Sequence, residues 1–217
     1  MGQAVIIYGK SGSGKSRSLK NFKEDEILFI NVEKKALPFR TKFKYTMASD
    51  NVEAIKGQLK KMPLKTAVID DAGYILTNTF MRGHRNKLGS AVYDLYNDIA
   101  DNFWSLFKFI KDELPADVII YILMHEDTSE VTGGTKLKTI GKLLDDKVCL
   151  EGMVTVVLRC MSEEGRHFFK TQTDGNDITK SPEEMFGAGE IANDLKLVDT
   201  AIRDYYEITG KQEEKAE

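Results

Sequence analysis

The chain has 217 residues, of which 41% are apolar and 30% are charged, and its formal net charge is -3. This composition is typical of a globular chain and excludes an extended disordered one. The small negative charge excludes a surface coated with cations, although a local basic loop can still bind a nucleic-acid backbone.

Cysteine content and hydropathy set the expected compartment. Cys149 and Cys160 provide no framework of paired cysteines, so a reducing cytosol is expected. The first residues lack the basic and then apolar pattern of a secretory signal, and no apolar stretch approaches the roughly 18 residues needed to cross a bilayer. We therefore expect a cytoplasmic protein without membrane contact.

Apolar runs alternate with helical patterns along the first half of the chain. The run at 4–8 predicts a strand buried on both faces, as in a parallel sheet. The following elements are expected to be a helix at 15–22, strands at 26–31 and 42–47, a helix capped by Asp50 that runs to about residue 61, and a strand at 66–70. Residues 72–89 are expected to form an irregular loop.

The second half continues this alternation. We expect a long helix at 90–112, a strand at 117–124, a loop at 126–138, a short helix at 140–147, paired strands at 153–159 and 167–172, a loop-rich segment at 173–189 and a closing helix at 191–208. The pattern predicts an α/β fold, a mainly parallel β-sheet flanked by helices. It also predicts a single domain at 1–209 with a charged tail at 210–217.

A glycine-rich octapeptide follows the first strand. Residues 9–16, GKSGSGKS, fit G-x-x-x-x-G-K-[ST] at every fixed position. Glycines let the backbone approach phosphate closely, and successive N–H groups form an anion-binding nest. Lys15 is expected to reach the β- and γ-phosphates of ATP, and the Ser16 hydroxyl to ligate Mg2+. The predicted nucleotide-binding residues are Gly9, Lys10, Ser11, Gly12, Ser13, Gly14, Lys15, Ser16 and Arg17, with Lys10 the one that also fits a solvated loop lysine.

A second acidic ligand is expected at the end of a neighbouring strand. Residues 66–70, TAVID, form an apolar run that ends in Asp70, which we interpret as the Walker B acid that supports Mg2+ together with Ser16. Asp71 follows and fits either a catalytic base or a structural group.

The segment at 28–38, LFINVEKKALP, resembles the strand and glutamate of RecA-like recombinases. The resemblance implies that Glu33 activates the water that attacks ATP; a surface glutamate in a charged turn with Lys34 and Lys35 is the alternative. It also implies that His125, at the end of the strand at 117–124, senses the γ-phosphate. The predicted catalytic residues are therefore Lys15, Glu33, Asp70 and His125.

Three further blocks are similar to small bacteriophage ATP-binding proteins of the RecA-like or AAA-type group: VIDDAGYILTNTFMR at 68–82, KLKTIGKLLDDKVCLEGM at 136–153 and ITKSPEEMF at 178–186. Some members of that group take part in single-strand DNA annealing and recombination. The resemblance implies a RecA-like sheet, a homo-oligomer, a phage recombination partner and location in the host cytoplasm.

Basic segments provide candidate DNA contacts. Residues 72–93 contain no acid but carry Arg82, Arg85 and Lys87, and cations interleaved with aromatics can bind a single strand. Lys136 and Lys138 form a second cluster, which fits another DNA contact or a lysine that reaches the ATP of a neighbouring subunit.

Together these patterns predict a Mg2+-dependent ATPase that acts in phage DNA recombination or single-strand annealing. Two alternatives stay open. One is a nucleotide or small-molecule kinase, since the loop also fits that class. The other is an ATP-dependent switch or recombination mediator with negligible turnover.

Overall fold

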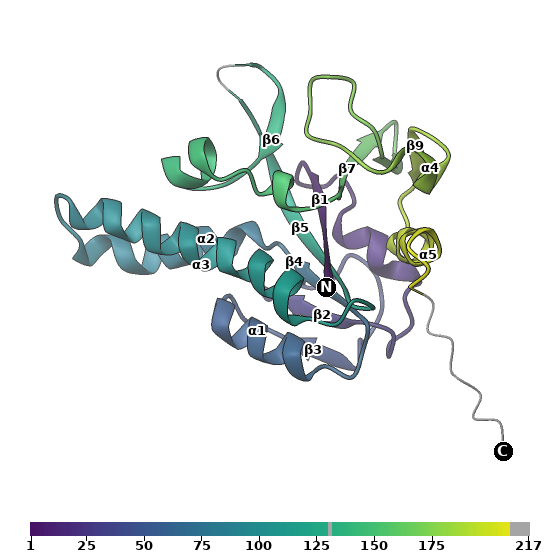
Figure 1. Cartoon of the computed structure of the whole chain (residues 1–217), viewed down its shortest axis with the longest axis horizontal. Coiled ribbons are helices and arrows are strands. Elements are labelled where there is room, and N and C mark those ends of the chain that lie inside the picture. Colours follow the sequence, from purple (N-terminus) through teal and green to yellow (C-terminus); the bar gives the residue numbers. More distant parts are fainter. Residues whose placement is uncertain (130–131, 209–217) are drawn as a thin grey trace.

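The computed structural model describes residues 1–129 and 132–208, which form a β-sheet with helices on both faces (Figure 1). The strands are β1 (Gln3–Gly9), β2 (Leu28–Asn31), β3 (Tyr45–Met47), β4 (Thr66–Asp70), β5 (Ile119–Thr128), β6 (Thr135–Leu137), β7 (Val156–Glu163), β8 (Arg166–Lys170) and β9 (Glu190–Ala192). The helices are η1 (Ser16–Asn21), α1 (Val52–Lys61), α2 (Gly73–Gly83), η2 (His84–Asn86), α3 (Ala91–Glu113), η3 (Leu143–Lys147), η4 (Glu151–Met153), α4 (Glu183–Phe186) and α5 (Leu195–Tyr205).

The strand order within the described residues is β3-β2-β4-β5-β1-β7-β8-β9, and β6 pairs with β5. The strands from β3 to β7 in this order are parallel, whereas β8, β9 and β6 are antiparallel to their neighbours. The prediction of a mainly parallel α/β sheet is confirmed. Because β5 lies between β1 and β4, its end separates the end of the glycine-loop strand from Asp70.

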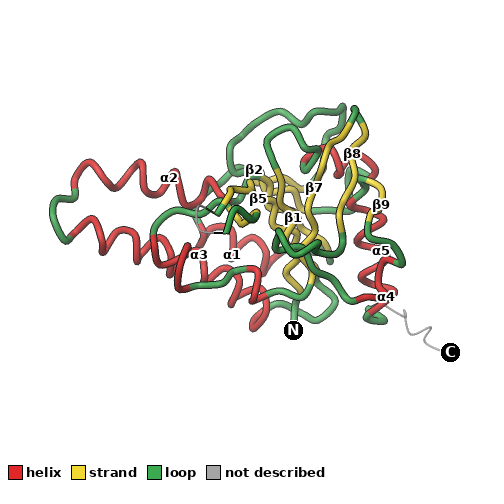
Figure 2. Tube along the Cα trace, turned by 90° about the horizontal axis from the view of Figure 1, so that it is seen from above, coloured by secondary structure: helices red, strands yellow, loops and turns green. Residues whose placement is uncertain are grey.

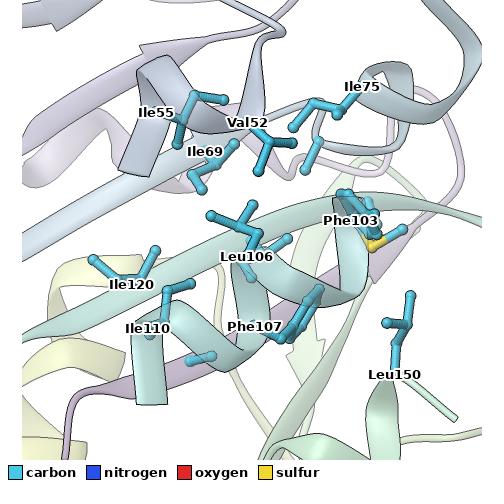
Figure 3. Packing of buried hydrophobic residues seen from close by; sticks show 14 of the residues in the cluster. Val52, Ile55, Ile69, Ile75, Phe103, Leu106, Phe107, Ile110, Ile120 and Leu150 are labelled. Carbon is cyan, nitrogen blue, oxygen red and sulfur yellow. The ribbon is translucent and has the colours of Figure 1, made fainter. Parts of the chain in front are cut away.

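Alternate side chains of the central strands enter two separate cores, as the two-residue period of a strand requires. Ile69 and Ile120 pack on one face with the apolar stripes of α1, α2 and α3 (Figure 3). Ile6 belongs to the same cluster. Ile7 and Tyr121 belong to the other face, which η1 and α5 cover. Burial on both faces explains why β1, β4 and β5 are continuous apolar runs.

The segment at 72–89 was predicted to be a loop, and this prediction is wrong. It forms α2 and η2, and α2 runs antiparallel to α3 so that the two helices extend away from the sheet (Figure 2). Ile75 and Leu76 are buried against the sheet core, and Phe80 packs on it. This tertiary packing outweighs the local glycine and polar content that indicated a loop. We call residues 77–98 the arm.

Several boundaries also differ from the prediction. The predicted loop at 126–138 contains the end of β5 and β6, which pair as an antiparallel hairpin. The closing helix begins only at Leu195, because Asp194 caps it and β9 precedes it. Asn51, not Asp50, caps α1, since its side chain accepts a hydrogen bond from the Ala54 N–H at 2.8 Å. The predicted tail at 210–217 lies outside the described residues.

Candidate functional site

The glycine loop joins the carboxyl end of β1 to η1, at the edge where parallel strands of α/β sheets bind ligands. A Cβ on Gly9 would lie 2.3 Å from the Cys160 carbonyl oxygen, so glycine is required there for close packing against β7. Gly12 and Gly14 have φ values of 79° and 107°, which glycine adopts without strain. The loop conformation therefore depends on the three glycines of the octapeptide.

The peptide between Ser13 and Gly14 is oriented from outside the loop. The Ser13 carbonyl accepts hydrogen bonds from the His167 Nδ1 at 2.8 Å and from the Cys160 thiol at 3.2 Å. Burial raises the pKa of Cys160 to about 11, so the thiol keeps its proton and remains a donor. Because the C=O and N–H of a trans peptide point in opposite directions, the Gly14 N–H faces away from these donors. This arrangement leaves it available to a phosphate.

Lys15 is buried and its ammonium folds back onto the loop. Its Nζ donates to the carbonyl oxygens of Gly9 and Lys10, both at 2.8 Å, and lies 3.5 Å from the His125 Nδ1. Burial lowers the pKa of Lys15 below its ordinary value. The ammonium therefore sits among weak partners that a phosphate can replace.

Ser16 and Asp70 lie together as predicted. The Ser16 hydroxyl donates to the Asp70 carboxylate, with both oxygens at 2.9 Å. Burial, followed by the charge of Asp71, raises the pKa of Asp70 to about 6. Burial destabilises the ionised form of Asp70, so a bound cation would stabilise it. Carboxylate and hydroxyl oxygens are ligands that Mg2+ prefers. The two side chains therefore fit a magnesium ion.

Asp71 contacts two side chains, His125 and Lys35, at the carboxyl ends of the parallel strands. Its Oδ1 lies 3.2 Å from the His125 Nε2, and its Oδ2 forms an ion pair with Lys35. Burial raises the pKa of Asp71, but the His125 and Lys35 contacts outweigh burial and hold it at about 2. Asp71 also has a φ of 58°, which turns the chain sharply from β4 into α2.

An open pocket of about 300 Å³ brings these groups together. Its lining residues are Ser11, Gly12, Gly14, Lys15, Ser16, Arg17, Lys35, Ala36, Pro38, Asp70, Asp71, His125 and His167. Most of the predicted nucleotide-binding residues line it, together with Asp70 and His125. Lys10 is exposed and lines the far side of the loop instead.

Glu33 does not line this pocket. Its carboxylate accepts a hydrogen bond from the Asn78 amide at 2.8 Å, and the same amide donates to Asp50 at 3.1 Å. Glu33 thus connects the loop after β2 to the base of the arm. Its role as the catalytic base stays a prediction, and Asp71 lies nearer to the phosphate loop.

Sequence reasoning missed Lys35, Cys160, His167 and Asn193 as parts of the site. Asn193 accepts from Arg17 at 3.2 Å and donates to the Cys160 sulfur at 3.3 Å. Lys35 was interpreted only as part of a charged turn. The other three belong to β7, to β8 and to the residue beyond β9, more than 140 positions from the loop, so no local motif signals them.

The predicted DNA-contact residues lie on two extensions of the sheet. Arg82 forms an ion pair with Asp50 at 2.6 Å, so its charge is already compensated. Arg85 and Lys87 lie at the tip of the arm, between α2 and α3. Lys136 belongs to β6, opposite Asp127, and the Lys138 N–H donates to the His125 carbonyl at 2.9 Å.

Two further features of the described residues bear on metal binding and on membrane contact. No group of three or more His, Cys, Asp or Glu side chains in 1–129 and 132–208 is arranged to hold a metal ion. Over the same ranges, no helix combines the length and apolarity needed to span a bilayer.

Comparison with known proteins supports the assignment of the loop. A family described as an AAA domain matches residues 1–189, which is most of the chain and includes the whole pocket lining. No curated protein was found to match the sequence. With its P-loop, its parallel sheet and this match, the chain belongs to the AAA domain family of P-loop nucleotide-binding proteins.

Proposed function

We propose that this chain is a Mg2+-dependent ATPase of the RecA-like type. The observation that carries the proposal is the Ser16 hydroxyl lying 2.9 Å from both Asp70 oxygens, beside Lys15. Strand order supports the RecA-like assignment, because β5 lies between the strand that precedes the P-loop and the strand that ends in Asp70.

The loop N–H groups and Lys15 bind the phosphates of ATP in this proposal. Lys15 exchanges the neutral Gly9 and Lys10 carbonyls for anionic phosphate oxygens, a gain because the ammonium then also forms an ion pair with its acceptor. Ser16 and Asp70 would hold Mg2+, which when bound neutralises charge on the phosphates.

Hydrolysis requires a residue that orients water opposite the leaving ADP. Water attacks the terminal phosphorus, the bond to the β-phosphate oxygen breaks, and the proton passes to a base. Glu33 is the candidate that the resemblance to RecA-like proteins implies. Asp71 is favoured by position, since it lines the pocket and contacts His125.

We further propose that the protein acts on single-stranded DNA in recombination or annealing, in the cytoplasm of a phage-infected host and as a homo-oligomer with a phage recombination partner. The tip of the arm supports DNA contact, because Arg85 is followed in the sequence by exposed Leu88 and Tyr93, in a stretch without acids. Helix α2, which leads into the arm, begins at Gly73, just after Asp71, and the β5–β6 hairpin follows His125. Both extensions are thereby connected to the phosphate end of the pocket.

The kinase alternative is less favoured by the pocket. A kinase needs arginines around the transferred phosphoryl group, and Arg17 is the sole arginine among the described residues that line the pocket. Arg17 also points to Asn193. A recombination mediator with negligible turnover is distinguished from an ATPase by measuring ATP hydrolysis.

The test is release of phosphate from ATP without an acceptor, with and without Mg2+ and single-stranded DNA. Wild type should release phosphate only with Mg2+, and faster with DNA. Asp70→Asn should lower the rate by about 10²-fold or more, whereas Asp25→Asn, which changes an exposed acid outside the pocket, should not. Intact ATP after long incubation would favour the mediator, and a rate indifferent to DNA would remove the recombination role.

A further inference from the structure

Lys35, Asp71, His125 and Lys15 form a continuous chain of side chains across the pocket. Lys35 pairs with Asp71, and the other Asp71 oxygen lies 3.2 Å from the His125 Nε2. The opposite ring nitrogen, Nδ1, lies 3.5 Å from the Lys15 ammonium. Because an ammonium can only donate, Nδ1 accepts and the Nε2–H donates to Asp71. Lys35 and Lys15 therefore lie at the two ends of this row of contacting side chains.

The backbone of Lys35 is fixed by Asn31, whereas its side chain is largely exposed apart from its contacts with Asp71 and Tyr74. The Asn31 side chain, at the end of β2, donates to the Lys35 carbonyl at 2.8 Å and accepts from the Lys35 N–H at 3.1 Å. The side chain of Lys35 is 58% exposed and passes over the Tyr74 ring, with Nζ 5.6 Å from the ring centroid. An exposed ammonium on a fixed backbone can change partners without moving the loop.

Asp71 is the partner that a nucleotide would replace. Lys35 lines the same pocket as Gly14, Lys15 and Ser16, on the side where His125 and the two aspartates lie. A terminal phosphate on Lys15 would enter next to these groups with more negative charge and more acceptor oxygens than one carboxylate. The ammonium would then find a stronger partner within the same pocket.

We propose that Lys35 is a catalytic residue that leaves Asp71 and binds the terminal phosphate of ATP. This inference rests on the proposed ATPase function and specifies how the site distinguishes a triphosphate from a diphosphate. ADP lacks the phosphate that attracts Lys35, so the Lys35–Asp71 pair stays closed with ADP and opens with ATP. Opening also frees an Asp71 oxygen to accept a hydrogen bond from water in the pocket.

Affinity for two nucleotides, measured by calorimetry with Mg2+, tests the proposal. The probes are ADP and an ATP analogue with a non-hydrolysable β–γ bridge. Lys35→Ala should weaken binding of the analogue by about 10-fold or more, the scale of one lost charge-assisted hydrogen bond, and change ADP binding by less than about 2-fold. Lys34→Ala is the matched control, because it removes the same charge from the adjacent exposed residue, which does not line the pocket.

The ratio of the two affinities separates the outcomes. Equal losses for ADP and the analogue in Lys35→Ala, or affinities that match those of Lys34→Ala, would overturn the role of Lys35 while leaving the ATPase proposal intact. A lower hydrolysis rate with an unchanged affinity ratio would overturn it as well, since Lys35 would then act only by positioning Asp71. Wild type that binds neither nucleotide would refute the proposed function itself. An unchanged thermal midpoint in both variants shows that the fold is retained.

Discussion

The phosphate pocket and the arm are neighbours in the chain but differ in how far their side chains are buried and bonded to other groups. In the pocket, Lys15, Asp70 and Asp71 are each at least 93% buried, and each has hydrogen-bond or ion-pair partners. In the arm, Met81, Leu88 and Tyr93 are 53%, 88% and 72% exposed. The side chains of the pocket are held by contacts within the fold, whereas these apolar side chains of the arm are exposed to solvent.

The arm is nevertheless ordered by its own packing. Phe80 stacks on both His84 and Tyr96, with ring centroids 5.0 and 4.9 Å apart, and Leu95 packs against Gly83. These contacts hold α2 against α3 and leave the outer side chains free for another role. We therefore expect single substitutions in the pocket to change nucleotide affinity. Substitutions on the outer side of the arm should instead change only binding to other molecules.

The largest expected effect is at the centre of the pocket. Lys15→Ala should weaken binding of Mg2+-ATP by about 100-fold or more, because it removes the charge-assisted contact of a buried ammonium with the phosphates. The thermal midpoint should change little, since burying a lysine charge is itself costly. Calorimetry and thermal unfolding measure the two quantities, and wild-type affinity in a folded Lys15→Ala protein would remove the phosphate site.

Two residues are candidates for the catalytic base: Glu33, which contacts Asn78 of the arm, and Asp71, which lines the pocket. If the resemblance to RecA-like proteins is right, Glu33→Gln should bind ATP normally but hydrolyse it about 10²-fold more slowly, and Asp71→Asn should have a smaller effect. Single-turnover hydrolysis at saturating ATP compares them. An inactive Asp71→Asn beside a normal Glu33→Gln would place the base in the pocket and leave Glu33 as the link to Asn78.

A smaller effect is expected from the groups that orient the loop from outside. His167→Leu should weaken Mg2+-ATP binding by about 2- to 10-fold, the value of one hydrogen bond to the Ser13 carbonyl. His167→Asn should retain affinity, because its amide nitrogen can replace the Nδ1 donor. Equal losses in both variants at an unchanged thermal midpoint would mean that the imidazole acts by packing and not by orienting the Ser13–Gly14 peptide.

The smallest effect on the isolated protein is expected at the arm. The double variant Arg85→Ala, Lys87→Ala should leave ATP affinity unchanged, but should flatten the salt dependence of single-strand binding by about 1 to 2 in logarithmic slope. Arg82→Ala is the comparison, since its charge is already paired with Asp50. A salt titration with labelled DNA and a non-hydrolysable ATP analogue measures the slope. Identical slopes for the double variant and wild type would show that the tip of the arm does not bind DNA.

Much of the site could be predicted because its signals are local. The glycines and Lys15 lie within eight residues, where backbone freedom and charge are specified by the sequence itself. The strand at 66–70 was predicted with its observed bounds, since an apolar run that ends in aspartate is also a local signal. The parallel sheet could be predicted for a similar reason, because strands buried on both faces are continuous apolar runs in the sequence.

The remaining features depend on contacts between distant residues. The sequence predicts a loop at 72–89, but α2 in this segment is stabilised by α3 and by the sheet, and local propensity does not report such contacts. His167 and Cys160 meet the Ser13 carbonyl only because β7 pairs beside β1 and β8 pairs beside β7. The phosphate loop, Asp70 and the class of sheet can be predicted from the amino-acid sequence, because they follow from short-range patterns. The pairing of Lys35 with Asp71 and of Glu33 with Asn78 depends on the three-dimensional fold, because strand order and the path of each loop set these distances.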